Sequence, residues 1–546
     1  MRSLSQSLAL AAALFTGIAV AVTPIEVQGR DFIDPTTNKR FMIVGADYQP
    51  GGQAGYKPDQ KVDALSDKEI CLRDAVMLQR LGVNTIRVYN VDPTLNHDDC
   101  ASIFNAAGIY MILDVNGPQS GESINRLEPW TSYHKDYLTR IFGVVENFKS
   151  YPNTLAFFAA NEVMNDMETG KINPQYIRAV QRDLKNYIKA NVDRKIPVAY
   201  SAADVREILE DTWAYMQCDN SDNSESDFFG LNSYSWCGSG ATFESAGYSE
   251  LVDMFKDSSV PVFFSEYGCN EVQPRVFEEV ATLYSEKMKT LSGGLVYEYS
   301  QEANNYGLVD VNTDGTVKLR ADFDNLQKAY SKLDMSKLEA PQTPIKAPKC
   351  DSKLIKNKAF DSNFTIPAVC PGCEDIIKNG IQKPTQGKIV KVTDTKCPKA
   401  VKGTKGDELK DLELKIVSNN DGASAPSNKT KPDTTLTPSN GTTPSLNGTA
   451  PVQAPFKNET ECANSTTPAA PGNSSTTVTL PSAPVVPPVL PTAPSTNQNQ
   501  PPSAPAAAPS ANASSSPALN TNAAASVLAS GWMSAVALGF AALMVL

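Results

Sequence analysis

Eight apolar, β-rich runs recur between residues 41 and 299, and they limit the folds that this chain can adopt. The runs lie at 41–46, 83–89, 109–115, 155–160, 197–201, 228–232, 260–265 and 294–299. Segments with helical periodicity separate most of them, as at 67–81, 176–188 and 275–288. Eight alternations of strand and helix over about 300 residues are typical of a closed (β/α)8 barrel, although doubly wound sheets also alternate. We therefore predict an α/β fold, a TIM-type barrel over residues 22–335.

The start of the chain predicts export. Residues 8–21 are apolar, follow a charged start at Arg2, and end in the small-x-small pattern of residues 19–21. This pattern predicts a secretory signal peptide at residues 1–21. A membrane anchor is the alternative, but the apolar run is short for a membrane span.

The far end of the chain carries a different signal. Residues 520–525 are small, residues 527–546 are apolar, and no charged residue follows Glu461. A small-residue site followed by an apolar tail predicts a GPI-attachment signal at residues 521–546. We expect attachment at Asn522, with Asn520 or a serine at 514–516 as alternatives. A single-pass membrane anchor is the competing interpretation, but it would usually carry cationic flanking residues.

Two segments lie between the barrel and this tail. Residues 336–400 are rich in lysine and contain four of the ten cysteines, which predicts a small appendage stapled by disulfides. Its Cys370-Pro-Gly-Cys373 motif could be a redox or zinc motif, but a structural disulfide fits an exported chain better. Residues 401–520 are dominated by Ser, Thr, Pro, Asn and Ala, which predicts a disordered, glycosylated stalk.

Two glutamates fall where apolar runs end. Glu162 follows the fourth run, directly after Asn161, and Glu266 follows the seventh run. In a parallel barrel the active site lies at the carboxyl ends of the strands, so these two strands can place both carboxylates across one cleft. Glycosidic cleavage requires such a pair, because one carboxyl group protonates the leaving oxygen and the other attacks the anomeric carbon or activates water. The alternative is that both are ordinary surface residues, since the chain has 60 acidic residues.

The sequence lacks the residues that other kinds of catalytic site require. The chain has two histidines, His97 and His134, and neither a GxSxG motif nor a glycine-rich phosphate loop occurs. We therefore expect no metal ion and no cofactor. The net charge of −11 gives no basis for binding nucleic acid.

Several motifs resemble one known family. They are GADYQPGG (45–52), TIRVYN (85–90), the pair Asn161-Glu162, GLNSYSWCG (230–238), FFSEYGCN (263–270) and GGLVYEYSQEANNYGLV (293–309). Together they are similar to the fungal GPI-anchored β-1,3-glucanosyltransferases of glycoside hydrolase family 72. The resemblance covers most of residues 24–340 and also extends to the signal, stalk and tail.

The resemblance implies a retaining double displacement in which Glu266 is the nucleophile and Glu162 is the acid/base. It places Asn161, Tyr89 and Tyr297 at the donor sugar and Tyr234 near the nucleophile. The loop after the third strand would line the donor side, and its residues are Asn116, Gly117, Pro118, Gln119, Ser120, Gly121, Glu122, Ser123 and Ile124. After the fifth strand, Asp204 and Arg206 are candidates for the acceptor side.

The family's cysteine framework implies three disulfides, which are Cys71–Cys100, Cys218–Cys350 and Cys237–Cys269. Some members carry a longer module with eight cysteines that binds carbohydrate, and this chain has too few further cysteines for it. The pairing of Cys370, Cys373, Cys397 and Cys462 stays open.

The function implied is a cell-surface 1,3-β-glucanosyltransferase that cleaves an internal β-1,3 linkage and transfers the new reducing end to the non-reducing end of another glucan. Its partners would be donor and acceptor β-1,3-glucan chains, cell-wall polysaccharide, and the plasma membrane through the GPI anchor. Two alternatives are a secreted endo-β-1,3-glucanase and a non-catalytic protein that binds wall glucan.

Overall fold

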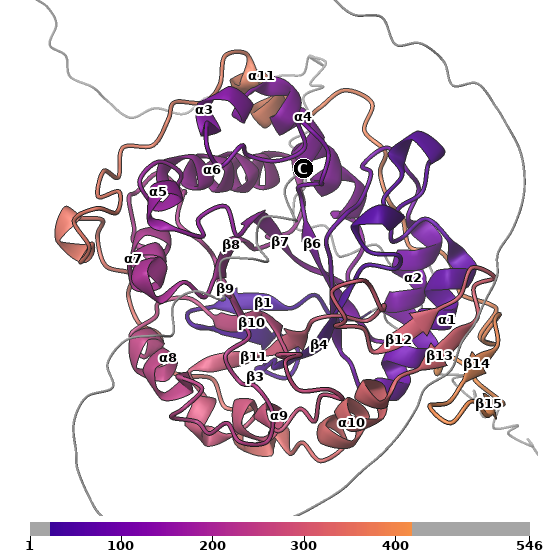
Figure 1. Cartoon of the computed structure of the whole chain (residues 1–546). Helices are drawn as coiled ribbons and strands as arrows, with labels where there is room; N and C mark the ends of the chain where they lie inside the picture. Colours follow the sequence, from indigo (N-terminus) through magenta and orange to yellow (C-terminus); the bar gives the residue numbers. More distant parts are fainter. Residues whose placement is uncertain (1–21, 418–546) are drawn as a thin grey trace, which may run out of the picture. The chain divides into compact units, whose positions relative to one another are not determined.

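Eight parallel strands close into a barrel in the computed structural model, which describes residues 22–417 (Figure 1). Each barrel strand pairs with the next one along the chain, and the last strand pairs with the first. Every strand overlaps one of the eight predicted apolar runs, so the predicted barrel is confirmed. In chain order the strands are β4 (Ile43–Tyr48), β5 (Thr85–Val88), β6 (Tyr110–Asp114), β7 (Thr154–Asn161), β8 (Val198–Ala203), β9 (Phe229–Ser233), β10 (Val262–Tyr267) and β11 (Leu291–Val296).

Helices follow the strands and surround the barrel (Figure 1). The longer ones are α1 (Lys68–Leu81), α2 (Asp98–Ala106), α4 (Lys135–Phe148), α6 (Pro174–Asn191), α7 (Arg206–Gln217), α8 (Tyr248–Phe255) and α10 (Ala321–Tyr330). The short ones are α3 (Pro129–Ser132), α5 (Met167–Gly170) and α9 (Glu279–Leu283), with 3-10 turns at Gln53–Gly55, Pro58–Gln60, Glu286–Met288, Met335–Lys337 and Ser352–Leu354.

One predicted helix is much shorter than expected. The periodic segment at 275–288 forms only α9 and the following 3-10 turn. Phe277 has a φ of 54°, in the left-handed region that a right-handed helix cannot include. The helix therefore begins after this residue, at Glu279.

Local signals in the sequence fix α1. The side chain of Asp67 accepts hydrogen bonds from the backbone N–H of Glu69 and Ile70, which satisfies donors that the first turn leaves free. Gly82 ends the helix with a φ of 94°, and its N–H reaches the carbonyls of Leu78 and Gln79.

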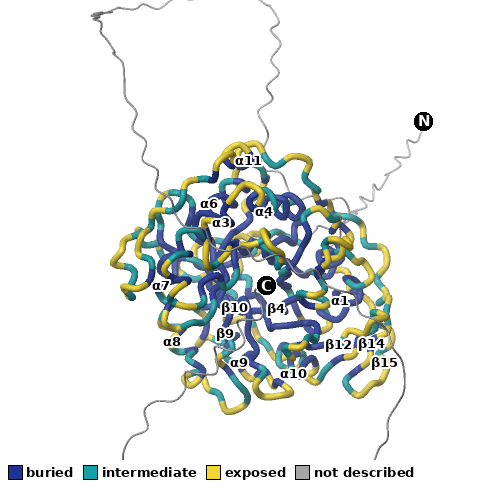
Figure 2. The backbone as a smooth tube through the Cα atoms, turned by 45° about the horizontal axis from the view of Figure 1, so that its top comes forward, coloured by how far each residue is buried: buried dark blue, intermediate teal, exposed yellow. Residues whose placement is uncertain are grey.

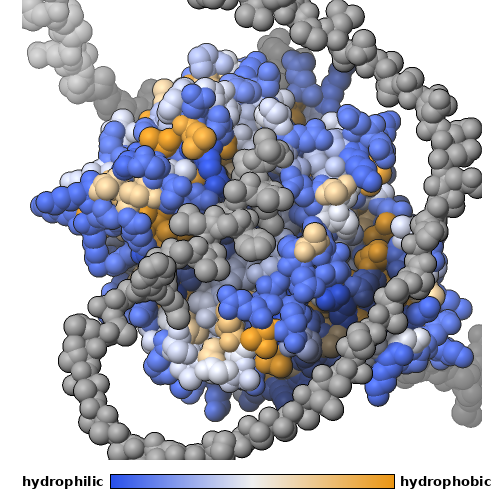
Figure 3. Space-filling view, viewed as in Figure 1, coloured by the Kyte–Doolittle hydropathy of each residue, from blue (hydrophilic) through white to orange (hydrophobic). Residues whose placement is uncertain are grey.

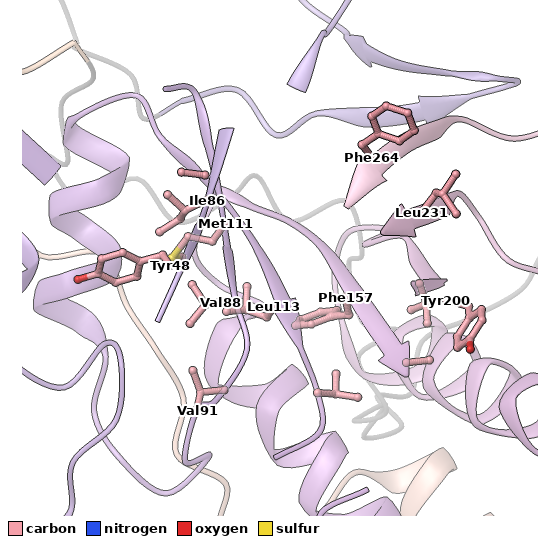
Figure 4. Close-up of a cluster of buried hydrophobic side chains, with 14 of the residues drawn as sticks. Tyr48, Ile86, Val88, Val91, Met111, Leu113, Phe157, Tyr200, Leu231 and Phe264 are labelled. Carbon is pink, nitrogen blue, oxygen red and sulfur yellow. The ribbon is translucent and has the colours of Figure 1, made fainter. Parts of the chain in front are cut away.

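Side chains alternate between two cores along the barrel strands. On β6, Met111 and Leu113 belong to a large core that also includes residues of the surrounding helices (Figure 4). The alternate residues Tyr110 and Ile112 belong to a smaller core. This alternation follows from the two-residue period of a strand, and Figure 2 shows the strands as the buried centre of a more exposed shell.

A small antiparallel sheet that the sequence analysis missed completes the smaller core. It consists of β1 (Glu26–Gln28), β2 (Asp31–Asp34) and β3 (Lys39–Arg40). Phe32 on β2 is fully buried, and its ring lies 5.7 Å from that of Phe228 and 5.8 Å from that of Phe263. The sheet thus packs its apolar face against side chains from inside the barrel.

Residues 336–417 follow the outside of the barrel rather than forming a separate core. Helix α11 (Cys373–Asn379) packs against α6, and the ring of Phe364 stacks on Tyr215 of α7 at 4.5 Å. Strands β14 (Val401–Lys402) and β15 (Glu408–Leu409) extend a sheet begun by β12 (Val309–Val311) and β13 (Val317–Leu319). The described chain therefore continues past the boundary expected at residue 400.

The three disulfides implied by the resemblance are present, at Cys71–Cys100, Cys218–Cys350 and Cys237–Cys269. The second of them ties the segment 336–417 to the end of α7. Cys370 and Cys373 are also bonded to each other. Cys397 is free within residues 22–417, and Cys462 lies outside them.

The predicted signal peptide, the stalk beyond residue 417 and the attachment signal with Asn522 lie outside the described residues. Within residues 22–417, no helix has the length and apolar character that crossing a membrane requires.

We predict that Phe32→Ala destabilises the protein by about 3–5 kcal/mol, because it removes a fully buried ring from the smaller core. The free energy of unfolding, measured by denaturant titration, tests this. Val62→Ala is the control, because Val62 is 41% exposed and its truncation should cost less than about 0.5 kcal/mol. A loss at Phe32 no larger than the control would show that the small sheet does not support the barrel.

Candidate active site

Glu162 and Glu266 lie at the same end of the barrel. Glu162 follows the last residue of β7, and Glu266 is the penultimate residue of β10. Because both strands are parallel members of one barrel, their carboxyl ends meet at one rim. Burial raises the pKa of Glu266, and the negative charge of Glu162 adds to that rise.

Three groups hold the carboxylate of Glu266, which is only 8% exposed. Arg87 Nη1 lies 3.1 Å from Oε1, and the hydroxyl of Tyr89 donates to the same oxygen at 2.9 Å. The hydroxyl of Tyr234 donates to Oε2 at 2.6 Å. Burial raises the pKa of Glu266 above its usual range, while the Arg87 charge and both tyrosine hydroxyls oppose that rise.

Arg87 is itself fixed on every side. Its Nε and Nη2 donate to the two oxygens of Asp114 at 3.1 and 2.9 Å, in a bidentate pair. The guanidinium also lies 4.3 Å from the ring centre of Tyr89 and 4.7 Å from that of Phe158. Arg87 and Asp114 were not predicted as site residues, although a charged residue inside an apolar strand run is a usable signal.

The carboxylate of Glu162 is oriented by an amide. Asn232 Nδ2 donates to Glu162 Oε1 at 2.9 Å and to Asn161 Oδ1 at 3.1 Å. Asn232 Oδ1 accepts from the hydroxyls of Ser201 and Ser265 at 3.1 and 2.7 Å. Because an ionised carboxylate only accepts hydrogen bonds, the NH2 group of Asn232 faces Glu162 and its oxygen faces the two hydroxyls, which can donate. Asn232 was quoted in a motif but was not predicted as a site residue.

The backbone at Glu162 is unusual. Its φ of 46° lies in the left-handed region, which non-glycine residues seldom occupy. The guanidinium of Arg126 donates to its carbonyl oxygen at 2.8 Å. The backbone therefore turns away from the direction of β7 at Glu162. Such left-handed conformations cluster at functional sites.

Four tyrosines form a wall beside Glu266. The ring of Tyr297 lies 6.3 Å from those of Tyr89 and Tyr234, and 5.3 Å from that of Tyr306. These pairs meet edge to face, and the hydroxyls of Tyr89 and Tyr234 reach the carboxylate of Glu266. Aromatic faces and hydroxyl donors are groups that suit a sugar ring, which has apolar faces and a polar edge. Sequence analysis predicted three of these tyrosines and missed Tyr306, which lies in one of the motifs quoted above.

The predicted loop 116–124 is held mainly by residues outside the glutamate pair. Asn116 Nδ2 donates to the carbonyl of Ala159 on β7 at 2.7 Å. Glu122 accepts from the hydroxyl of Tyr56 at 2.9 Å and pairs with Arg140 at 3.2 Å. Gln119, Ser120, Gly121 and Ser123 are exposed, Gly117 and Pro118 are partly exposed, and Ile124 is buried.

The two acceptor-side candidates contact each other. Arg206 Nε lies 2.6 Å from Asp204 Oδ1, and the hydroxyl of Ser233 donates to Asp204 Oδ2 at 2.7 Å. Ser233 directly follows Asn232, which holds Glu162. Asp204, which follows β8, is therefore linked through Ser233 to the residue on β9 that contacts Glu162. Seen from the side used in Figure 1, the visible surface is largely hydrophilic with small apolar patches (Figure 3).

Comparison with known proteins identifies the family. The profile of the glucanosyltransferase family, glycoside hydrolase family 72, matches residues 15–334. The chain belongs to this family. It is 52% identical over 415 residues to the 1,3-beta-glucanosyltransferase gel2 of Aspergillus fumigatus, covering 74% of this chain and 86% of the relative. It is 44% identical over 433 residues to the probable 1,3-beta-glucanosyltransferase GAS3 of Saccharomyces cerevisiae, covering 74% and 82%.

A solved structure of the family also matches this fold. A mutant of Saccharomyces cerevisiae Gas2p, in complex with laminaritetraose and laminaripentaose, superposes with a TM-score of 0.57 and 37% sequence identity. The match covers 64% of this chain and 75% of that protein.

We predict that Arg87→Met lowers kcat/KM by on the order of 100-fold, because it removes the charged donor that holds Glu266. The loss of the positive charge should also raise the pKa of Glu266 further, so the acid limb of the pH profile of kcat/KM should move to higher pH.

Arg80→Met is the matched control, because Arg80 is an exposed arginine in the last turn of α1. An unchanged acid limb in Arg87→Met, with the fold intact, would contradict the assigned role of Arg87.

Proposed function

We propose that this protein is a 1,3-β-glucanosyltransferase that cleaves an internal β-1,3 linkage and joins the new reducing end to the non-reducing end of another β-1,3-glucan. The observation that carries the proposal is the pair Glu162 and Glu266 at one barrel rim, in a chain that belongs to the glucanosyltransferase family. The named activity of the relatives gel2 and GAS3 supports it.

In the first step, Glu266 attacks the anomeric carbon and Glu162 transfers a proton to the departing glucan oxygen. The bond to that oxygen breaks, and a glycosyl ester forms on Glu266. Arg87 and the two tyrosine hydroxyls stabilise the carboxylate before attack and orient one of its lone pairs toward the sugar. The amide of Asn232 orients Glu162 for proton transfer.

In the second step, the 3-hydroxyl at the non-reducing end of an acceptor glucan loses its proton to Glu162 and attacks the anomeric carbon of the glycosyl ester. The bond between that carbon and the Glu266 oxygen breaks, a new β-1,3 bond forms, and the two inversions retain the anomeric configuration. Transfer exceeds hydrolysis when the acceptor hydroxyl is held in position better than water.

The placement of the aromatic wall and of the ion pair supports an assignment of the donor and acceptor sides. We assign Tyr89, Tyr234 and Tyr297, with Asn161, to the sugar next to Glu266. We assign the loop 116–124 to the more distant donor sugars. Asp204 and Arg206, which follow β8 and contact Ser233 beside Asn232, are assigned to the acceptor.

Mass spectrometry of reaction products tests the activity. A fragment of residues 22–417 should be used, since a fragment ending near residue 400 would remove β14 and β15 from their sheet. With a reduced linear β-1,3-gluco-oligosaccharide, we predict products both shorter and longer than the substrate. Shorter products alone would indicate an endo-β-1,3-glucanase, and an absence of products would indicate a binding protein.

Glu162→Gln and Glu266→Gln should each lower transfer by at least about 1,000-fold, because each removes a group used in the bond-breaking step. Glu286→Gln is the control, since Glu286 is an exposed glutamate outside the site. Full activity in either site variant would rule out the assigned mechanism.

We further propose that the protein is exported with removal of residues 1–21 and is held on the outer face of the plasma membrane by a GPI anchor at Asn522, with part of it in the cell wall. Its acidic composition and disulfides are suited to that compartment. Release of the protein from intact cells by phosphatidylinositol-specific phospholipase C is the expected result. Retention after that treatment would contradict the anchor.

A further inference from the structure

More carboxyl groups lie beside Glu266 than the surrounding cations can neutralise. Asp47 and Glu298 are both fully buried, and their charges act on each other and on Glu266. The cation that acts on Asp47 is Arg87, which is already paired with Asp114 and Glu266. Within residues 22–417, neither oxygen of Asp47 has a hydrogen-bond partner, and the neighbouring Tyr89 hydroxyl donates its proton to Glu266 instead.

Two carboxyl oxygens beside the aromatic wall, Glu298 Oε2 and Glu302 Oε1, are buried and have no hydrogen-bond partner among the described residues. Glu298 and Glu302 are neighbours that affect each other's pKa, and the side chain of Gln49 also acts on Glu302. Two ionised carboxylates offer only acceptors, so a hydrogen bond between them requires a proton on one of them. The other oxygen of Glu298 already accepts from Asn304 Nδ2 at 2.9 Å.

The same amide connects this pair to the aromatic wall. Asn304 Nδ2 also lies 3.3 Å from the hydroxyl oxygen of Tyr297, and the Asn304 carbonyl accepts from Asn270 at 2.8 Å. Tyr297 directly precedes Glu298 in the chain. The position of its hydroxyl beside Glu266 therefore depends on Asn304, and the position of Asn304 depends on Glu298.

We propose that Glu298 is a positioning residue that works as a neutral carboxylic acid, sharing one proton with Glu302 and holding Tyr297 in place through Asn304. This inference deepens the proposed function and rests on it for the role of Tyr297. Glu298 does not contact the substrate in this account.

Electrostatics supports the neutral form. Burial, and then the neighbouring Glu302 and Glu266, raise the pKa of Glu298 to about 9. Burial and Glu266 likewise raise the pKa of Asp47, with Arg87 opposing. An ionised Glu298 would add a further negative charge near Glu266 and raise the pKa of the nucleophile. A neutral Glu298 adds no such charge, so the Arg87 charge is not offset by it.

The pH dependence of stability tests the proton directly. Between the pKa of an unfolded glutamate, about 4.3, and the raised pKa of the folded state, folded Glu298 keeps a proton that the unfolded chain has lost. The wild-type protein therefore loses stability through this group as the pH rises from 5 to 8. Glu298→Gln is neutral at every pH and removes this loss.

We therefore expect the Tm of Glu298→Gln, relative to wild type, to rise by on the order of 1–2 °C for each pH unit between pH 5 and 8. Its amide can also donate to Glu302, so it should keep most of the transfer activity. Glu298→Ala lacks that donor and should lower kcat/KM on the order of tenfold. Glu286→Gln, at an exposed position, should show a Tm difference that does not depend on pH.

A Tm difference between Glu298→Gln and wild type that stays constant with pH would show that Glu298 is ionised, and the proposal would be wrong. It would also be wrong if Glu298→Gln were folded but as inactive as Glu266→Gln. If Glu298→Gln does not fold, Glu302→Gln serves instead: it removes the Glu302 charge that raises the pKa of Glu298 while burial remains, so the trend of Tm with pH should have the same sign and a smaller size. The Tm series needs no substrate, so it gives its answer even if the wild-type protein fails to transfer glucan.

Discussion

The buried guanidinium of Arg87 is the group on which the site depends. It pairs with Asp114 on one side and with Glu266 on the other, and it neutralises charge in a region where several carboxyl groups are buried. Without it, burial would favour the protonated form of Glu266, which cannot act as a nucleophile. The fold holds Arg87 rigidly, because its flat face rests on the ring of Phe158.

The contact between Arg87 and Phe158 connects the active site to the smaller core of the barrel. Phe158 packs against Phe228 and Phe263, and these two rings pack in turn against Phe32 of the small antiparallel sheet. Residues at the start of the chain therefore support a guanidinium at the catalytic rim through a continuous series of aromatic contacts. These ring contacts link the small sheet to the guanidinium that contacts Glu266.

The sequence was sufficient to predict the barrel and the two glutamates, because strand periodicity and the ends of apolar runs are local signals. The resemblance to a family supplied the tyrosines Tyr89, Tyr234 and Tyr297. Arg87, Asn232 and the Glu298–Glu302 pair were not predicted. Their importance depends on contacts between strands far apart in the chain, and no local pattern shows that Asn232 faces Glu162. The course of residues 336–417 along the helices was also hidden, because short polar strands and isolated apolar residues give weak periodicity.

The central claim is that Glu266 forms a covalent bond with the sugar while Glu162 moves the proton. Glu162→Gln, incubated with a β-1,3-gluco-oligosaccharyl fluoride whose leaving group needs no protonation, should accumulate the glycosyl ester because the second step lacks its base. Peptide mass spectrometry after acid quenching should then locate one glycosyl group on the peptide that contains Glu266. Modification of another carboxyl group, or turnover of the fluoride with inverted anomeric configuration, would contradict the account.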